Sequence, residues 1–265
     1  MITHFAHLQL QTVSIQGIKH FYHELLRFPI SYESEQEIHV QSTAHCTISF
    51  IETAEPIAPA HFAFEVPYSV FDEVVNWVEQ KPILLLHWDD GRVIDQFKTG
   101  KNVYFRDVDG NLLEIIAHPY IPKDILTASG PLHILYLREV GFPVESVINF
   151  RENLVELLDF KLDKVSDLFT FAIGGTAHAV IPSTRRKWIP IAMVALPPAM
   201  HVTFGSSDVT FIDEVERRLQ QKGISYQRKA KGDLHFKIDG YHLSVCLTTF
   251  PKEALGRLGL PFSIV

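Results

Sequence analysis

The chain repeats one pattern of predicted elements four times, and this repetition constrains its fold more than any other feature. Each copy starts with a short alternating strand, continues with an amphipathic helix and ends with further strands. The opening strands are predicted at residues 7–11, 61–66, 133–137 and 201–204, and the helices at 14–26, 70–79, 144–158 and 209–222. This order predicts an α+β fold built from four βαβββ modules.

The other strands of each module are short runs of apolar and β-branched residues between turns. A connector with three prolines, residues 119–131, separates the second module from the third. We therefore expect two domains, residues 1–119 and 131–265. The remaining strands are predicted at residues 30–33, 37–41, 46–51, 83–87, 102–106, 112–117, 161–163, 169–173, 178–181, near 226, 234–238 and 243–247.

Composition narrows the classes of function. The 265 residues carry a formal charge of -7, and their basic residues form only short runs, which argues against a nucleic-acid partner. No apolar run is long enough to span a membrane, and the first ten residues do not resemble a secretory signal. We expect a soluble cytoplasmic protein, monomeric or homodimeric, in which Cys46 and Cys246 stay reduced.

A histidine lies in the first predicted strand of every module: His7, His61, His133 and His201. A single histidine at such a place can simply donate a hydrogen bond to a neighbouring carbonyl. Four at matching places, on the polar side of the alternation, indicate a shared functional position. His7 and His61 alternate with apolar neighbours that should pack beneath the helices.

Glu114 lies inside an apolar strand that returns from the turn Asp109-Gly110. Burying an isolated carboxylate costs several kcal/mol, so such a residue usually faces solvent, a cation or a metal ion. The structural alternative is that Glu114 pairs with Arg106 on a wet surface.

The pattern Tyr104-x-x-Asp107-x-Asp109-Gly110-x-x-x-Glu114 resembles the vicinal oxygen chelate superfamily. This superfamily includes glyoxalase I, fosfomycin-resistance enzymes, bleomycin-binding proteins and extradiol dioxygenases. The resemblance covers most of the chain and implies that consecutive modules pair into two cupped mixed β-sheets with helices on the outer faces.

The resemblance also implies a metal site in the N-terminal domain, held by His7, His61 and Glu114. A divalent ion of Fe, Mn, Ni or Zn suits these ligands and would leave positions open for a small substrate with two adjacent oxygens. In the C-terminal domain the place of Glu114 is taken by Ser244, so that pair of modules is expected to have lost its metal.

Other roles follow from the same resemblance. Tyr104 and Glu52 are the candidate catalytic residues, and Arg106 and Gln9 are the candidate substrate-binding residues. The catalytic histidine of the dioxygenase signature is absent from residues 94–97. The reaction therefore stays open between ring cleavage, glyoxalase-like isomerisation and epoxide opening. The alternative is a metal-free protein that sequesters a ligand, as the bleomycin-binding relatives do.

Overall fold

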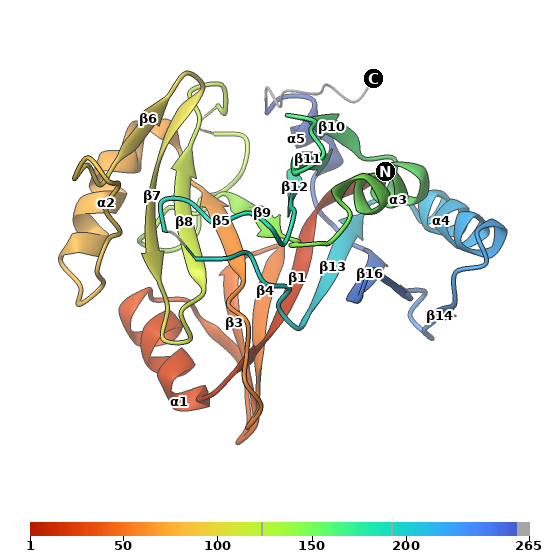
Figure 1. Cartoon of the computed structure of the whole chain (residues 1–265), viewed down its shortest axis with the longest axis horizontal. Helices are drawn as coiled ribbons and strands as arrows, with labels where there is room; N and C mark the ends of the chain where they lie inside the picture. The colour runs from red at the N-terminus through yellow and green to blue at the C-terminus, as the bar shows by residue number, and fades with distance from the viewer. Residues whose placement is uncertain (123, 192, 259–265) are drawn as a thin grey trace.

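The computed structural model describes residues 1–122, 124–191 and 193–258, and these form two eight-stranded mixed sheets with helices packed against them (Figure 1). The first module contains β1 (Ile2–Thr12), α1 (Ile15–Ile18) with a π-helical continuation (Lys19–Leu25), β2 (Ile30–Glu33), β3 (Glu37–Thr43) and β4 (Cys46–Glu52). The second contains β5 (His61–Glu65), α2 (Phe71–Glu79), β6 (Asp95–Phe97), β7 (Gly100–Arg106) and β8 (Leu112–Ala117).

The C-terminal half repeats the same order. The third module contains β9 (Tyr136–Gly141), α3 (Val147–Leu158), β10 (Lys161–Asp163), β11 (Phe169–Gly174) and β12 (Ala177–Pro182). The fourth contains β13 (Met200–Ser206), α4 (Val209–Gln221), β14 (Tyr226–Arg228), β15 (Leu234–Ile238) and β16 (Tyr241–Leu247), and α5 (Lys252–Leu255) follows it. The predicted α+β fold of four modules and two mixed sheets is confirmed.

The pairing of the modules differs from the prediction. One sheet has the order β14-β15-β16-β13-β1-β4-β3-β2, and the other has the order β10-β11-β12-β9-β5-β8-β7-β6. The first module therefore shares a sheet with the fourth, and the second shares a sheet with the third. The expectation that modules one and two form one sheet is wrong, because alternation predicts which face of a strand is buried but not which strand edges meet.

Two of the predicted strands also differ from the strands that the structure shows. Residues 83–87 contribute only a bridge from Leu85 to Phe105, and the short strand β6 takes the expected place at the sheet edge. The first strand of the third module begins at Tyr136, so His133 lies in the loop before it with a φ of 51°. The first strand of the third module therefore does not contain His133, and residues of β9 occupy the position predicted for this histidine.

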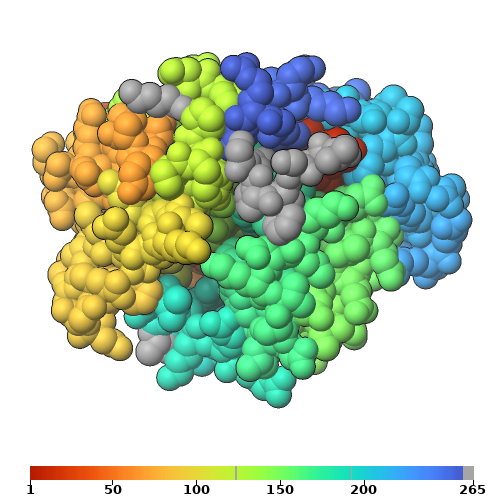
Figure 2. Space-filling view, turned by 90° about the horizontal axis from the view of Figure 1, so that it is seen from above, coloured from red at the N-terminus to blue at the C-terminus, as the bar shows by residue number. Residues whose placement is uncertain are grey.

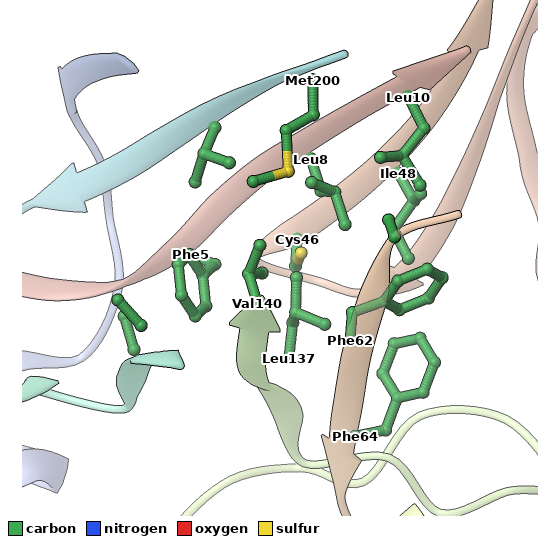
Figure 3. Close-up of a cluster of buried hydrophobic side chains, with 14 of the residues drawn as sticks. Phe5, Leu8, Leu10, Cys46, Ile48, Phe62, Phe64, Leu137, Val140 and Met200 are labelled. Carbon is green, nitrogen blue, oxygen red and sulfur yellow. The ribbon is translucent and has the colours of Figure 1, made fainter. Parts of the chain in front are cut away.

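The apolar faces of the two sheets meet in one continuous core (Figure 3). Leu8 of β1 and Phe62 of β5, which were expected to pack beneath the helices, are both fully buried there. The helical segment of the first module contributes to the same core: Tyr22 packs on Phe50 of one sheet, and Phe21 lies near Phe105 of the other. The opposite face of the second sheet carries polar side chains beside a separate apolar cluster that includes Tyr104, Leu112 and Val180.

In the part of the chain that the structure describes, we found no helix with the length and apolar character needed to cross a lipid bilayer.

The unexpected pairing can be tested by a disulfide between β1 and β13. Gln9 lies directly opposite His201 in this antiparallel pair, and such neighbours are about 4.5–5.5 Å apart between Cα atoms, within disulfide range. We expect the Gln9→Cys/His201→Cys variant, in a Cys246→Ser background, to cross-link under mild oxidation. Non-reducing peptide mapping would detect the bond. Gln9→Cys/Lys237→Cys is the matched control, because β15 lies two strands beyond β13; equal cross-linking of both variants would contradict the topology.

Candidate metal centre

The candidate site lies on the three central strands of the second sheet. Ala63 of β5 is the cross-strand neighbour of Glu114 on β8 and also of Glu139 on β9. Directly opposed side chains project from the same face of a sheet, and His61, two residues before Ala63, shares that face. Because the alanine is small, the two carboxylates and the imidazole converge over it.

The three functional side chains are close and buried. One ligand atom of each of His61, Glu114 and Glu139 lies within 4.8 Å of the others. His61 Nε2 lies 3.7 Å from Glu114 Oε2 and 3.8 Å from Glu139 Oε2, which is too far for hydrogen bonds. Among the described residues this is the group of three such side chains that could hold a metal ion.

The hydrogen bond at Nδ1 of His61 determines the tautomer of its neutral ring. His61 Nδ1 lies 3.0 Å from the carbonyl oxygen of Leu112 and, because a carbonyl can only accept, Nδ1 is the donor. In the neutral ring Nε2 then carries a lone pair that faces two carboxylates. A metal-binding histidine is commonly oriented by such a bond through its second nitrogen.

The two carboxylates behave differently in this buried setting. Burial, and then the nearby charge of Glu139, raise the pKa of Glu114 well above its usual value. Burial opposes ionisation of Glu139 as well, but the neighbouring His61 and Arg138 outweigh it and lower the pKa of Glu139. Without a cation, therefore, the protonated form of Glu114 limits the repulsion between the pair.

The donor set fits a divalent transition ion. Two carboxylates balance a charge of +2, and one imidazole supplies a nitrogen ligand of the kind that Zn, Ni, Fe and Mn accept. Metal–ligand bonds of about 2.0–2.2 Å would put neighbouring ligand atoms about 3–4 Å apart, the range in which His61 Nε2 lies from both carboxylates. His61, Glu114 and Glu139 are thus the residues that would hold the ion.

Polar neighbours surround this group. Asn102 Nδ2 donates to Glu114 Oε1 over 2.6 Å and lies 3.0 Å from the hydroxyl oxygen of Tyr104. Burial, and then the charge of Glu114, raise the pKa of Tyr104 well above its usual value, so it remains a hydrogen-bond donor. A register shift in the β5–β9 pair falls at Arg138 and brings it to the same cavity as Glu139.

A cavity of about 550 Å³ opens above the three side chains. The second and third modules, coloured yellow and green to teal, lie against one another on this side of the molecule (Figure 2). The ring of Trp188 lies 4.9 Å from that of His61. Gly141 makes this possible, because a Cβ there would come within 2.7 Å of the indole. The other aromatic side chains that line the cavity include Trp88, Phe97, Tyr104, Phe169 and Phe171.

Several buried polar atoms that line this cavity have no partner within the described residues. They include Nε2 of His178 and Nε of Arg138. His178 lies opposite Glu139 in the sheet, and burial lowers its pKa well below the usual value. Unpaired buried groups of this kind are costly unless a ligand or water satisfies them, so this cavity is a candidate binding site.

The structure brings together His61, Glu114 and Tyr104, as predicted, but separates them from His7 and Gln9. Those two residues lie on β1 in the other sheet. There His7 Nε2 lies 2.7 Å from the hydroxyl of Ser49, and Gln9 is opposite His201. The structure therefore does not bring the predicted metal trio of His7, His61 and Glu114 together, because the place of its first member depended on the pairing of modules one and two.

Two other predicted roles do not match the structure. Glu52 is exposed at the end of β4, and its Oε2 accepts a hydrogen bond of 2.9 Å from the backbone nitrogen of Ile15 at the start of α1. Arg106 is exposed at the end of β7 and is not among the residues that line the cavity. Glu52 therefore accepts a hydrogen bond at the start of α1. Neither Glu52 nor Arg106 is placed to contact a ligand in the cavity.

Glu139 was not among the residues predicted from the sequence, and His178 was expected to serve packing or hydrogen bonding rather than to complete another site. A signal for Glu139 was present, because the charged pair Arg138-Glu139 interrupts the apolar stretch HILYLREVGF. The prediction assigns the first-strand position of the third module to His133 instead, whereas the strand itself begins at Tyr136.

Comparison with known proteins supports the fold. The sequence matches no family profile and no curated protein. A protein of Bacillus subtilis, designated a candidate dioxygenase, superposes with a TM-score of 0.68 at 11% identity over 98% of this chain and 90% of its own. Glyoxalase I from Zea mays superposes with a TM-score of 0.59 at 14% identity over 96% of each chain. The chain therefore has the tandem-module fold of the vicinal oxygen chelate proteins.

The placement of His7 leads to a prediction about acid stability. Burial, with smaller contributions from His39 and His201, lowers the pKa of His7 to about 4. The pKa of His7 in the folded protein is thus below its value of about 6.5 in the unfolded chain. The contribution of His7 to the free energy of unfolding is therefore complete above pH 6.5 and is lost as pH falls towards 4. His7→Gln should reduce the loss of stability between pH 6.5 and 4.5 by about 2 kcal/mol, allowing for partial exposure.

Urea denaturation at the two pH values would measure this change. His242→Gln, at an exposed position on the same sheet, is the control and should keep the acid dependence of the parent. An unaltered acid dependence in His7→Gln would show that the prediction is incorrect.

Proposed function

We propose that this protein is a metal-dependent enzyme of the vicinal oxygen chelate type, acting on a small substrate whose two adjacent oxygens bind the ion. The observation that carries the proposal is the buried group of His61, Glu114 and Glu139, in which His61 Nε2 lies 3.7 Å from one carboxylate and 3.8 Å from the other. A divalent ion between them would offset the burial cost of both carboxylates.

When bound, the ion would act as a Lewis acid that polarises the substrate oxygens and acidifies the adjacent O–H or C–H group. The residues of this chain have separate tasks around it. Asn102 fixes one oxygen of Glu114, and Tyr104 can donate a hydrogen bond to developing negative charge on the substrate. Trp188 covers His61 and excludes water from that side.

His178 lies beside this group and is a candidate to contact the bound substrate. Its ring is buried, its Nε2 has no partner in the described part of the chain, and it stands next to Glu139 in the sheet. Two carboxylates in the candidate ligand set favour chemistry by polarisation and proton transfer, as in glyoxalase-type isomerisation. Ring-cleaving oxygenation usually employs two histidines and a single carboxylate.

A metal-free binding protein is the second candidate. The aromatic lining of the cavity favours it, because Trp88, Phe97, Phe169, Phe171 and Trp188 could enclose a planar ligand without an ion. Elemental analysis of protein purified without chelators separates the two functions. An enzyme of the proposed type carries about one transition ion per chain, and a metal-free binder carries none.

Substitution of the carboxylates gives the direct test. We expect Glu114→Gln and Glu139→Gln each to weaken metal binding by more than the 10–100-fold typical of lost outer-shell partners, with the fold retained. His7→Gln is the matched control and should keep its metal. Isothermal titration with Zn²⁺ and plasma emission spectrometry would measure the effect. Metal loss in His7→Gln, or full occupancy in both glutamine variants, would contradict the proposal.

A second test of the metal position leaves the three proposed metal ligands unchanged. Ala63 is the small residue between the two carboxylates, so Ala63→Leu should fill the space that the ion needs. We expect metal binding to fall by at least about tenfold in this variant, by analogy with other changes beside metal ligands. Equilibrium dialysis against Zn²⁺ would show it. Unchanged affinity would mean that the ion does not lie over Ala63.

A further inference from the structure

The side of the cavity that lies away from the candidate metal ligands is formed by the third module. Phe169 and Phe171 of β11 line it, and they share one face of the sheet because they are two residues apart in one strand. The centres of their rings are 5.0 Å apart, and the rings meet edge to face. These two half-buried rings form an aromatic wall of the kind that a planar apolar ligand contacts.

A positively charged side chain lies over each ring of the aromatic wall. Cζ of Arg186 is 4.6 Å from the ring centre of Phe169, and Nζ of Lys164 is 5.1 Å from the ring centre of Phe171. Both distances are within the range of cation–π attraction, which holds these flexible side chains against the wall. Arg186 and Lys164 also line the cavity.

These two cations are not neutralised by the acidic side chains around them. In the part of the chain that the structure describes, neither Arg186 nor Lys164 forms an ion pair, although Asp163 lines the same side of the cavity. Oδ1 of Asp163 instead accepts a hydrogen bond of 2.8 Å from the backbone nitrogen of Lys164. Asp95, which also lines the cavity, pairs with Arg92. A protein with a formal charge of -7 thus presents positive groups at this cavity, and such a local field attracts anions.

The backbone fixes the segment that carries Arg186. Its nitrogen donates to the carbonyl of Ser183 over 2.8 Å, and its carbonyl accepts from the nitrogen of Ala195 over 3.0 Å. The nitrogen of Trp188, two residues further along, donates to the carbonyl of Met193 over 2.8 Å. One ordered segment therefore places a guanidinium on the aromatic wall and an indole beside His61.

The aromatic wall and the candidate metal centre lie at two sides of one cavity. The sheet order β11-β12-β9-β5 puts β11 three strands from the strand that carries His61. Three spacings of about 4.8 Å amount to about 14 Å between the strand axes, and side chains from both strands shorten the interval. The cavity of about 550 Å³ between them is large enough for a molecule of drug size. A ligand that contacts both sides is therefore longer than the two oxygens that an ion would bind.

We propose that Arg186 and Lys164 bind an anionic group at one end of the substrate. A planar aromatic ring of the same molecule then lies against Phe169 and Phe171, and its other end is directed towards the candidate metal centre. The substrate class is thus an aromatic carboxylate. Arg186 has the larger role, because a planar guanidinium binds a carboxylate through two parallel hydrogen bonds, whereas the ammonium of the exposed Lys164 acts as a point charge. This inference names the substrate class of the proposed function, and it rests on that function only for the ion at the far end of the ligand.

Isothermal titration of the full chain with 2-naphthoate and with 2-naphthamide tests this assignment, because the two probes share a ring system and differ in charge. We expect 2-naphthoate to bind at least about tenfold more tightly, as a hydrogen bond between charged groups would provide. Added salt should reduce this preference, because ions screen a partly exposed cation.

Arg186→Gln is the decisive variant. It should lower the affinity for 2-naphthoate by about tenfold and leave the affinity for 2-naphthamide unchanged, so the preference disappears. Arg185→Gln is the matched control and should behave as the parent, because Arg185 is the exposed neighbour of Arg186 and is not among the residues that line the cavity. Phe171→Leu should weaken the binding of both probes, because it removes a ring contact that both share.

The possible failures are distinct. A parent chain that does not bind 2-naphthoate or binds both probes equally, or an Arg186→Gln variant that keeps the preference, overturns the assignment of the anionic end. Retention of the 2-amide affinity in Arg186→Gln shows that the cavity is still folded. A parent chain without bound metal contradicts the proposed function instead, and the preference for 2-naphthoate is still expected in that protein.

Discussion

Two carboxylates on either side of one alanine, in the middle of a sheet, create the electrostatic problem on which the arrangement of this cavity depends. Glu114 and Glu139 are both buried and project from the same face as His61. The two carboxylates cannot both be ionised at low cost unless a cation lies between them. Without a cation, one of them keeps its proton. The neighbouring groups fit this requirement, since Asn102 donates to Glu114 and Arg138 lies beside Glu139.

The site depends on the contact between the second and third modules. Glu114 comes from β8 and Glu139 from β9, so the two carboxylates meet only because β5 joins these strands in one sheet. The cavity above them is likewise lined by residues from both modules. The sheet of the first and fourth modules has hydroxyl groups at the corresponding places. There His7 contacts Ser49, and His201 contacts Ser244. A serine hydroxyl is a weaker ligand for a divalent ion than a carboxylate.

Much of the fold could be predicted from the sequence, because the periodicity of strands and helices is a local property. The four modules and the position of Glu114 inside a buried strand followed from alternation and from the turn at Asp109-Gly110. The partner of each module could not be predicted in this way, because all four modules present similar strand edges. That error placed His7 in the metal site, and together with the assignment of His133 to the first strand of the third module it excluded Glu139.

The most direct measurement is anomalous diffraction at the absorption edge of the metal that copurifies with the protein, or of Zn²⁺ added to it. The account predicts one strong peak over Ala63, within bonding distance of His61 Nε2 and of both Glu114 and Glu139. A peak beside His7 in the other sheet, or no peak between the two carboxylates in crystals grown with excess Zn²⁺, would contradict it.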